Sequence, residues 1–202
     1  MVIAKVAKEQ GADLLISGAL KQETFRKYYF GSIARKLARQ TDIPILLIPD
    51  PSEDPKPIRK IIVSVNDESP QKVIQKGLAF ARVFKAEKIY FVKESSIKNS
   101  RHLFKRYYSE KQSDLLEEQL VEEEQDYIYK MLDQYDLSGI DITTKILFGH
   151  SGVALVHYAA EIEADMLVDA YPQLKFGFWD KLFPRNIEYA LLNLPCKLLL
   201  IN

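Results

Sequence analysis

Short runs of Val, Ile and Leu alternate along the chain with longer amphipathic segments. These apolar runs predict strands over 12–18, 43–48, 59–66, 87–93, 140–148, 164–171 and 195–201. The amphipathic segments predict helices over 2–10, 31–40, 68–84, 151–162 and 184–193, a mostly helical region over 98–136, and loops over 19–30 and 172–183. Strands that alternate with helices pair in parallel and are covered by helices on their faces. The pattern therefore predicts an α/β fold.

A proline-rich segment separates the predicted elements into two groups. The segment 49–60, PDPSEDPKPIRK, has four prolines and no apolar periodicity before Ile58. Proline-dense, charged segments are extended linkers rather than packed elements. We therefore predict a front unit at 1–50, a linker at 51–57 and a back unit at 58–202, with two strands in the front unit and five in the back unit.

The two ends of the chain carry related sequences. AKEQGADLLISGALK at 7–21 is similar to AAEIEADMLVDAYPQ at 159–173, and DIPILLIPD at 42–50 is similar to NLPCKLLLIN at 193–202. Such self-similarity indicates a structural repeat. The front unit is therefore interpreted as a copy of the last helix-strand-helix-strand of the back unit.

The front unit contains a candidate phosphate site. The strand over 12–18 ends at Gly18, and Gly31 and Ser32 open the next helix. Phosphates bind the free amides at a helix N-terminus, and glycine allows closer approach than a Cβ permits. Ser32 would donate its hydroxyl or cap the helix, and Lys21 would supply a positive charge. The same pattern also fits a strand-end turn and an ordinary helix cap, because short glycine patterns often occur by chance.

These residues resemble the nucleotide motif of the universal stress protein family, G-x2-G-x9-G-[S/T], which precedes a helix and a final strand. Gly18 matches the first glycine, Lys21 stands at the second, and Gly31 and Ser32 match the last pair, followed by Ile33. The resemblance implies that these five residues hold the phosphates of an adenine nucleotide, ATP or AMP. Lys21 departs from the family, because a side chain stands where the motif has bare backbone.

Residues 58–202 resemble the same family over their whole length. RKIIVSVNDES at 59–69 is similar to the family's opening strand, whose end carries an Asp that contacts the nucleoside, and Asn66 holds that place here. The places of the motif glycines are taken by Asp169 or Ala170, Gln173 and Phe183-Pro184. A proline has no N–H to donate, and a carboxylate repels phosphate. The back unit is therefore expected to be a structural or regulatory copy that binds no ATP.

The resemblance implies an architecture and a set of partners. The family's strand order is 3-2-1-4-5, so residues 58–202 should form an open parallel five-stranded sheet between helices, with 1–50 as the C-terminal half of a second such domain. The last strands of two such domains commonly pair, which implies that strand 43–48 lies antiparallel to strand 195–201 and that the chain forms a homodimer. Strand 12–18 would otherwise be an exposed apolar edge. We expect a second chain, or sequence upstream of Met1, to cover it.

Composition and motifs exclude several classes of function. Lys plus Arg and Asp plus Glu total 28 each, so the basic excess of a nucleic-acid-binding protein is missing. A single Cys196 argues against a disulfide framework or a cysteine zinc site. No apolar run approaches the roughly 20 residues that span a bilayer, and no signal peptide is recognised, which predicts a cytoplasmic chain. SVNDES at 64–69 lacks both glycines of a pyrophosphatase loop, and no metal or catalytic motif is recognised. We expect no enzymatic activity.

Two functions stay open. Residues 178–202 resemble the C-terminus of cation/proton antiporters that carry tandem stress-protein domains as a cytoplasmic tail, which implies a membrane transporter in the same full-length protein. The chain would then be a nucleotide-responsive regulatory module. The alternative is a structural or dimerisation domain that binds no nucleotide.

Overall fold

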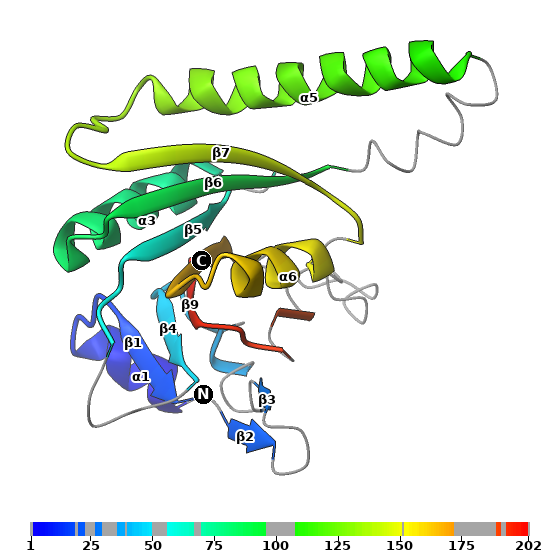
Figure 1. Ribbon diagram of the computed structural model, residues 1–202. Coiled ribbons are helices and arrows are strands. Elements are labelled where there is room, and N and C mark those ends of the chain that lie inside the picture. The colour runs from blue at the N-terminus through cyan, green and yellow to red at the C-terminus, as the bar shows by residue number, and fades with distance from the viewer. Residues whose placement is uncertain are drawn as a thin grey trace.

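The structure of the chain is a computed structural model that describes residues 2–18, 20–22, 27–29, 36–38, 40–49, 56–66, 70–95, 108–150, 152–171, 189–190 and 193–201. Within these ranges the helices are α1 (Val2–Glu9), α3 (Pro70–Phe84), α5 (Glu110–Leu132) and α6 (Val153–Glu161). The strands are β1 (Leu15–Gly18), β2 (Leu20–Gln22), β3 (Lys27–Tyr29), β4 (Ile45–Ile48), β5 (Lys60–Ser64), β6 (Lys88–Ser95), β7 (Asp141–Phe148), β8 (Met166–Ala170) and β9 (Lys197–Ile201). Figure 1 shows their arrangement.

Seven of these strands form one mixed sheet in the order β1-β4-β9-β8-β5-β6-β7. The run from β9 through β8, β5 and β6 to β7 is parallel throughout, which confirms the order 3-2-1-4-5 expected for residues 58–202. The expected antiparallel pairing of the two final strands is also confirmed, because Ile45, Leu46 and Leu47 of β4 lie opposite Leu200, Leu199 and Leu198 of β9. The sheet has seven strands rather than five because β4, with β1 parallel to it, extends it.

The junction between β4 and β9 is buried on both faces of the sheet. Ile45 and Leu47 belong to one buried apolar cluster, and Leu46, on the opposite face, belongs to the other. Alternate residues of a strand point to opposite faces, so the unbroken ILLI run of β4 suits a strand that is covered on both sides. Strand β4 of the front unit, which we also call the front segment (residues 1–50), thus belongs to the same core as the rest of the sheet.

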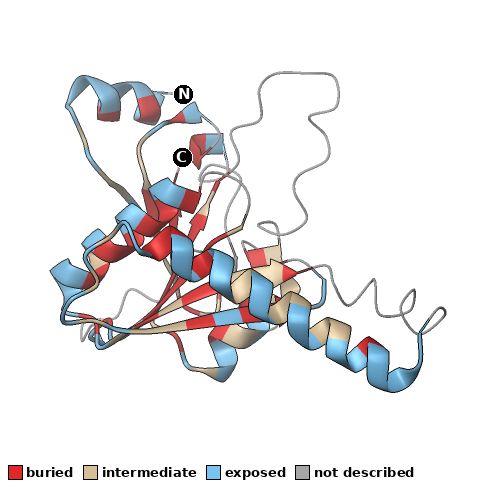
Figure 2. Cartoon of the chain, turned by 90° about the horizontal axis from the view of Figure 1, so that it is seen from above, coloured by how far each residue is buried: buried red, intermediate tan, exposed pale blue. Residues whose placement is uncertain are grey.

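Helices cover the two faces of the sheet, and each face has its own apolar cluster. The first cluster contains residues of α1 and α6, including Ala4, Leu155 and Ala159. The second contains residues of α3 and α5, including Ile74 and Ile128. Figure 2 shows the buried positions gathered where helices meet the sheet. The fold is therefore a three-layer α/β sandwich.

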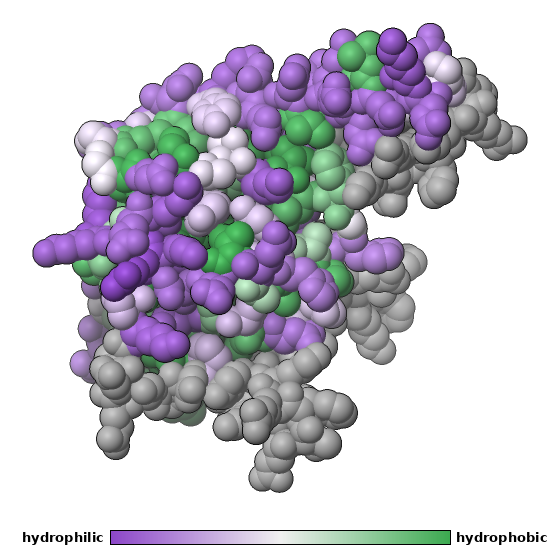
Figure 3. Space-filling view, viewed as in Figure 1, coloured by the Kyte–Doolittle hydropathy of each residue, from purple (hydrophilic) through white to green (hydrophobic). Residues whose placement is uncertain are grey.

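Helix α5 is packed at its C-terminal end and largely solvated at its N-terminal end. Ile128, Met131 and Leu132 are buried against the sheet. The first turn begins with a capping box, in which the Ser109 hydroxyl accepts from the Gln112 amide and the Gln112 side chain accepts from the Ser109 amide. Figure 3 shows the visible surface of this helix as mainly hydrophilic. The cap lets α5 begin beyond the edge of the apolar core.

The loop predicted over 19–30 is partly wrong. Residues 20–22 and 27–29 form strands β2 and β3, which pair antiparallel with Lys21 opposite Tyr28. The segment KYY at 27–29 is rich in aromatic residues, which favour strands, and the prediction gave this propensity too little weight. The predicted helix at 31–40 has helical residues at 36–38 and 40, and that at 184–193 has them at 189–190. The loop predicted at 172–183 lies outside the described residues.

Helix α3 lies unusually close to the central strand β5. A Cβ atom built on Gly77 of α3 would lie 2.5 Å from Cγ2 of Val63 on β5, which is closer than real Cβ contacts allow. Val63 is fully buried in the middle of the sheet, so its side chain has little room to move. The absence of a side chain at Gly77 therefore sets how closely α3 packs on β5.

We expect Gly77→Ala to destabilise the protein. Alanine in a helix interior is favoured over glycine by about 1 kcal/mol, but overpacking a core costs about 1–3 kcal/mol. The steric cost should exceed the helical gain, so the free energy of unfolding should fall by about 1 kcal/mol in urea denaturation. In a Val63→Ala background, which removes the obstructing methyl groups, the same substitution should be neutral or stabilising. A stabilising effect in the wild-type background would contradict the close packing.

Candidate functional site

Gly18 and Lys21 of the predicted phosphate motif are three residues apart in the chain, at the end of β1 and in β2. Gly18 is the last residue of β1, and Lys21 is the middle residue of β2. The other predicted residues of this motif, Gly31, Ser32 and Ile33, lie outside the described residues. The structure thus places the first half of the motif at a strand end and leaves its assembly with the second half a prediction.

The backbone at Gly18 is open. Gly18 is exposed, and a Cβ built on it would have no described atom within 4 Å. Its carbonyl oxygen accepts a hydrogen bond of 3.3 Å from the hydroxyl of Ser17. A ligand could therefore approach the main chain at the end of β1 without displacing a described side chain.

Asn66, the predicted nucleoside contact, follows the end of the central strand β5. Its amide nitrogen donates to the Ser64 hydroxyl oxygen at 2.9 Å, and its amide oxygen accepts from the Glu94 backbone amide at 3.1 Å. Both polar ends of the side chain are thus used to join the end of β5 to the end of β6. A nucleoside contact by Asn66 stays a prediction, and it would compete with these two hydrogen bonds.

Gly18 and Asn66 lie at opposite ends of the sheet along its strand direction. Strand β1 is parallel to β4, and β4 is antiparallel to β9, which is parallel to β8 and β5. The carboxyl end of β1 therefore points in the opposite direction to that of β5. The structure does not bring the predicted phosphate and nucleoside residues together into one site.

The carboxyl end of β8 is the place in the back unit that corresponds to Gly18. The repeat aligns Asp13 with Asp165, and so places Ala170 opposite Gly18. Beside it stands the buried Asp169, whose carboxylate accepts the Ala170 amide at 2.9 Å, while the Tyr171 amide donates to the Ile201 carbonyl at 2.8 Å. The backbone donors at this strand end are occupied, and a carboxylate stands beside them. That the back unit binds no phosphate stays a prediction.

Glu94, near the end of β6, was missed by the motif comparison. One carboxylate oxygen of Glu94 accepts hydrogen bonds from the Gly152 amide at 2.7 Å and the Leu155 amide at 3.3 Å, at the start of α6. Gly152, the N-cap residue, offers no side chain of its own, and acidic groups are stabilising at a helix N-terminus. Glu94 therefore fills the position that an anion would take on this helix. The sequence carried no signal for this contact, because Ser151 stands at the start of the predicted helix and Glu94 is 58 residues from Gly152.

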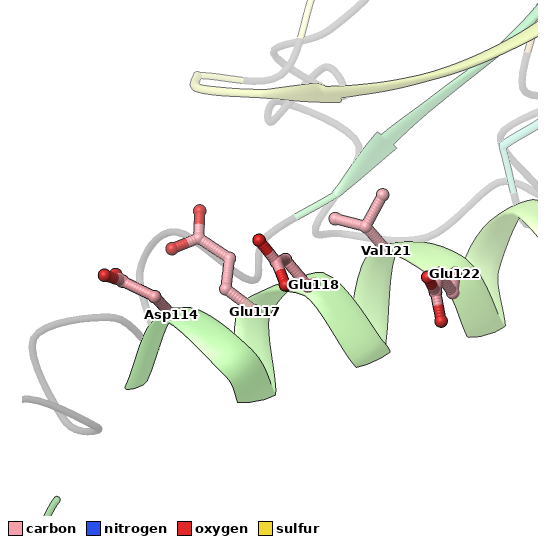
Figure 4. Close-up of a pocket in the computed structure, with 5 residues that line it drawn as sticks. All are labelled: Asp114, Glu117, Glu118, Val121 and Glu122. Carbon is pink, nitrogen blue, oxygen red and sulfur yellow. The ribbon is translucent and has the colours of Figure 1, made fainter. Parts of the chain in front are cut away.

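A cavity of about 550 Å³ lies along α5, far along the chain from the predicted motif. Figure 4 shows the described side chains that line it. They are Asp114, Glu117, Glu118, Val121 and Glu122. Four carboxylates on one helix repel an anionic ligand such as a nucleotide phosphate. Among the described residues, no group of three or more His, Cys, Asp or Glu is arranged to hold a metal ion.

Cys196 is buried beside the start of β9. Burial, with a smaller contribution from the Asp165 carboxylate, raises the pKa of the Cys196 thiol to about 12. Because the thiolate is the nucleophilic form, the thiol is unreactive at neutral pH. The residue is a small apolar part of the core.

None of the helices in the described ranges combines the length and the apolar content that a membrane crossing requires.

The sequence pattern of the Universal stress protein family matches residues 1–49 and 57–202. No curated protein showed significant sequence similarity to the chain. Together with the sheet order, the family match accounts for almost the whole chain on both sides of the proline-rich segment.

Solved structures share the fold. A protein of unknown function from Pseudomonas aeruginosa PAO1 superposes with a TM-score of 0.68 at 16% identity, over 99% of this chain and 66% of its own. A universal stress protein from Archaeoglobus fulgidus DSM 4304 gives 0.64 at 13% identity, over 100% and 65%. The universal stress protein UspA from Lactobacillus plantarum gives 0.52 at 16% identity, over 73% of this chain and 100% of its own. At these identities the likeness is one of fold, and the chain spans about two thirds of the first two proteins.

We expect Asn66→Ala to reduce the free energy of unfolding by about 1–2 kcal/mol, because it leaves the partly buried Glu94 amide without its acceptor. Urea denaturation followed by circular dichroism measures the loss. Asn66→Asp keeps an acceptor for the Glu94 amide and should lose less. Wild-type stability in the alanine variant would show that these hydrogen bonds contribute nothing.

The buried Cys196 should resist alkylation. At pH 8 a thiol with a pKa of about 12 is ionised in roughly one molecule in ten thousand, whereas a solvated cysteine is ionised in about a quarter of molecules. Iodoacetamide, followed by mass spectrometry, should therefore modify the folded protein at least about a hundredfold more slowly than the protein unfolded in guanidinium chloride. Equal rates would mean that the thiol is accessible in the folded state.

Proposed function

The chain belongs to the universal stress protein family, and on this premise we propose that it is a cytoplasmic, non-catalytic regulatory module that responds to an adenine nucleotide, ATP or AMP. The nucleotide is held at the front segment by Gly18, Lys21, Gly31, Ser32 and Ile33. The back unit supplies the scaffold against which the front segment is fixed.

This proposal rests on the difference between the ends of β1 and β8, which correspond to each other in the sequence repeat. At the end of β1, Gly18 leaves the backbone open on its side-chain side. At the end of β8, Ala170 replaces it, and the neighbouring carboxylate of Asp169 occupies the Ala170 amide. An open glycine at a strand end that precedes a predicted helix start is suited to an anion, whereas the second arrangement opposes one.

The pairing of β4 with β9 supports a regulatory role. The front segment shares both apolar clusters with the back unit through Ile45, Leu46 and Leu47. A ligand that alters the loop after β1 would act on a segment that is fixed to the larger unit by backbone pairing and by a shared core. This connection offers a physical path from a binding event to a change that a partner detects.

We propose further that the chain is a tandem of family domains, with a front half at 1–50, a linker at 51–57 and a complete unit at 58–202. The family match on both sides of residues 50–56 and the repeated sequences support this division. A homodimer is proposed from the strand pairing that the family resemblance implies. An attached cation/proton antiporter is proposed from the resemblance of residues 178–202 alone.

The alternative function is that of a structural or dimerisation domain that binds no nucleotide. It is favoured by the side chain of Asn66, whose polar atoms are both hydrogen-bonded to Ser64 and Glu94. It is favoured also by the opposite orientation of β1 and β5, which separates the two predicted halves of the site. A ligand titration decides between the two functions.

We expect calorimetric titration to show that ATP binds more tightly than AMP, and that adenosine gives no measurable heat. The reason is that the predicted contacts are to phosphates and not to the nucleoside. Gly18→Asp should weaken ATP binding at least about tenfold, because it adds a carboxylate beside the phosphates and loses about 1.4 kcal/mol or more.

Ala170→Asp is the matched control, since it adds the same charge at the equivalent place in the back unit and should leave ATP affinity unchanged. The alternative function would gain support if ATP gave no heat or if the Gly18→Asp variant bound it as well as the wild type.

A further inference from the structure

Strand β7 forms one end of the sheet and has a long open edge. Among the described strands, β7 pairs with β6 alone, in parallel from Asp141 to Phe148. Figure 1 shows β7 at the far end of the sheet from β1. An edge strand presents main-chain donors and acceptors that can pair with another strand. The β7 edge is therefore able to accept one.

Main-chain hydrogen bonds show which residues of β6 face β7. The Val65 amide donates to the Val92 carbonyl at 2.9 Å, and the Lys88 amide donates to the Arg59 carbonyl at 3.0 Å. The main-chain groups of Lys88 and Val92 thus face β5. Because this direction alternates along a strand, the main-chain groups of Phe91 face β7.

The same rule gives the direction of each residue of β7. Phe91 lies opposite Thr144. In a parallel ladder a residue bonds to the two neighbours of the residue opposite it, which here are Thr143 and Lys145. The main-chain groups of Thr144 therefore point the other way, toward the open edge, as do those of Ile142. Ile142 and Thr144 are the residues that would bond to an added strand.

Two exposed side chains of opposite charge flank Thr143 on this strand. Asp141 and Lys145 are exposed, and they share one face of β7 with Thr143, since alternate residues point to the same face. Lys88 of β6 lies beside them, with its Nζ 2.9 Å from Oδ2 of Asp141. A carboxylate has several acceptor positions, so Asp141 is able to hold a second cation as well as Lys88.

We propose that β7 pairs antiparallel with β7 of a second copy of the chain, about a two-fold axis beside Thr143. In this register Asp141 of each copy lies opposite Lys145 of the other. Ile142 lies opposite Thr144 and exchanges main-chain hydrogen bonds with it, whereas the residues that carry the charges form the closer, non-hydrogen-bonded pairs. The sheets of the two copies then join into one.

The charges favour this register over its neighbours. An axis beside Lys145 would place two ammonium groups opposite each other, and an axis beside Asp141 would place two carboxylates opposite each other. An axis beside Thr144 would leave the charges opposite Thr143 and Leu147. Lysine on an edge strand usually opposes pairing, but Asp141 on the same strand makes this edge complementary to its own copy.

The other strands at the ends of the two units are less suited to this contact. Strand β9, the last strand, is already paired with β8 on one side and with β4 of the same chain on the other. Strand β1 has the sequence LISG and carries no charge that would select a register. This inference rests on the homodimer of the proposed function and names the surface that forms it. It does not depend on nucleotide binding at Gly18.

Disulfide trapping in the whole chain tests the register. Thr143→Cys places two thiols opposite each other at the axis, where Cα atoms of a non-hydrogen-bonded pair are about 4.5 Å apart, within the range of disulfides. Oxidation with copper phenanthroline should therefore give a covalent dimer on a non-reducing gel. The wild-type chain is the control, because its Cys196 is buried and should not crosslink.

Two further cysteine variants distinguish this register from one centred on a charged residue. Asp141→Cys and Lys145→Cys should crosslink at least about tenfold faster when the two proteins are mixed than when either is oxidised alone, because the register places position 141 opposite position 145. Efficient crosslinking of Lys145→Cys alone would contradict it.

Exchange of the charges tests recognition in solution. Sedimentation equilibrium should show that Lys145→Asp raises the dimer dissociation constant at least about tenfold, because carboxylates then lie opposite each other. Adding Asp141→Lys to this variant restores opposite charges and should return the constant close to the wild-type value. Lys72→Asp, at an exposed position on α3, changes the net charge equally and should leave the dimer unchanged. Equal urea midpoints exclude a folding defect.

The proposal is overturned by any of three results. The first is a wild-type chain that stays monomeric at every concentration reached, which also removes the proposed homodimer. The second is a wild-type dimer in which Thr143→Cys does not crosslink, which leaves a homodimer through another surface. The third is a double variant that stays as weak as Lys145→Asp. The ATP titration reports on Gly18 separately, so its failure is distinguishable from these results.

Discussion

The antiparallel pairing of β4 with β9 is the constraint on which the rest of the structure depends. It joins the front segment to the larger unit through a strand that is buried on both faces, so one pair of apolar clusters runs across the junction. Burying an aliphatic side chain stabilises by about 1.5–3 kcal/mol, so the three aligned residues of β4 hold the front segment firmly. The same pairing also reverses the direction of β1 relative to β5.

That reversal decides what the predicted site residues can do together. Gly18 ends β1, and Asn66 follows β5. These two strands run in opposite directions, so the two residues lie at opposite ends of the sheet along its strand direction. At the carboxyl ends of β5 and β6, the polar groups already have hydrogen-bond partners. Asn66 forms hydrogen bonds with Ser64 and Glu94, and the Glu94 carboxylate caps the N-terminus of α6. Satisfied polar networks of this kind fix local geometry. At the carboxyl end of β1, the backbone at Gly18 is open on its side-chain side.

The comparison of the two repeats explains why the front segment carries exposed apolar residues. Its buried positions match those of the back unit where both contact the shared core, and they differ where the back unit has β5, α3 and β6. An uncovered apolar strand at a sheet edge is a liability, which natural proteins usually avoid by covering or charging it. Ile16 is neither covered by a described residue nor replaced by a charge.

The sequence by itself determined the alternation of strands and helices, because the spacing of apolar residues shows whether one face or both faces of an element are buried. With the family resemblance it also determined the strand order and the β4–β9 pairing. It did not reveal the β2–β3 hairpin, the cap that Glu94 places on α6, or the contact of Gly77 with Val63. Each of these depends on which elements meet in space, since Glu94 and Gly152 are 58 residues apart. The predicted phosphate motif shows the same division. Its spacing can be read from the sequence, but only tertiary packing placed Gly18 and Asn66 at opposite ends of the sheet along its strand direction.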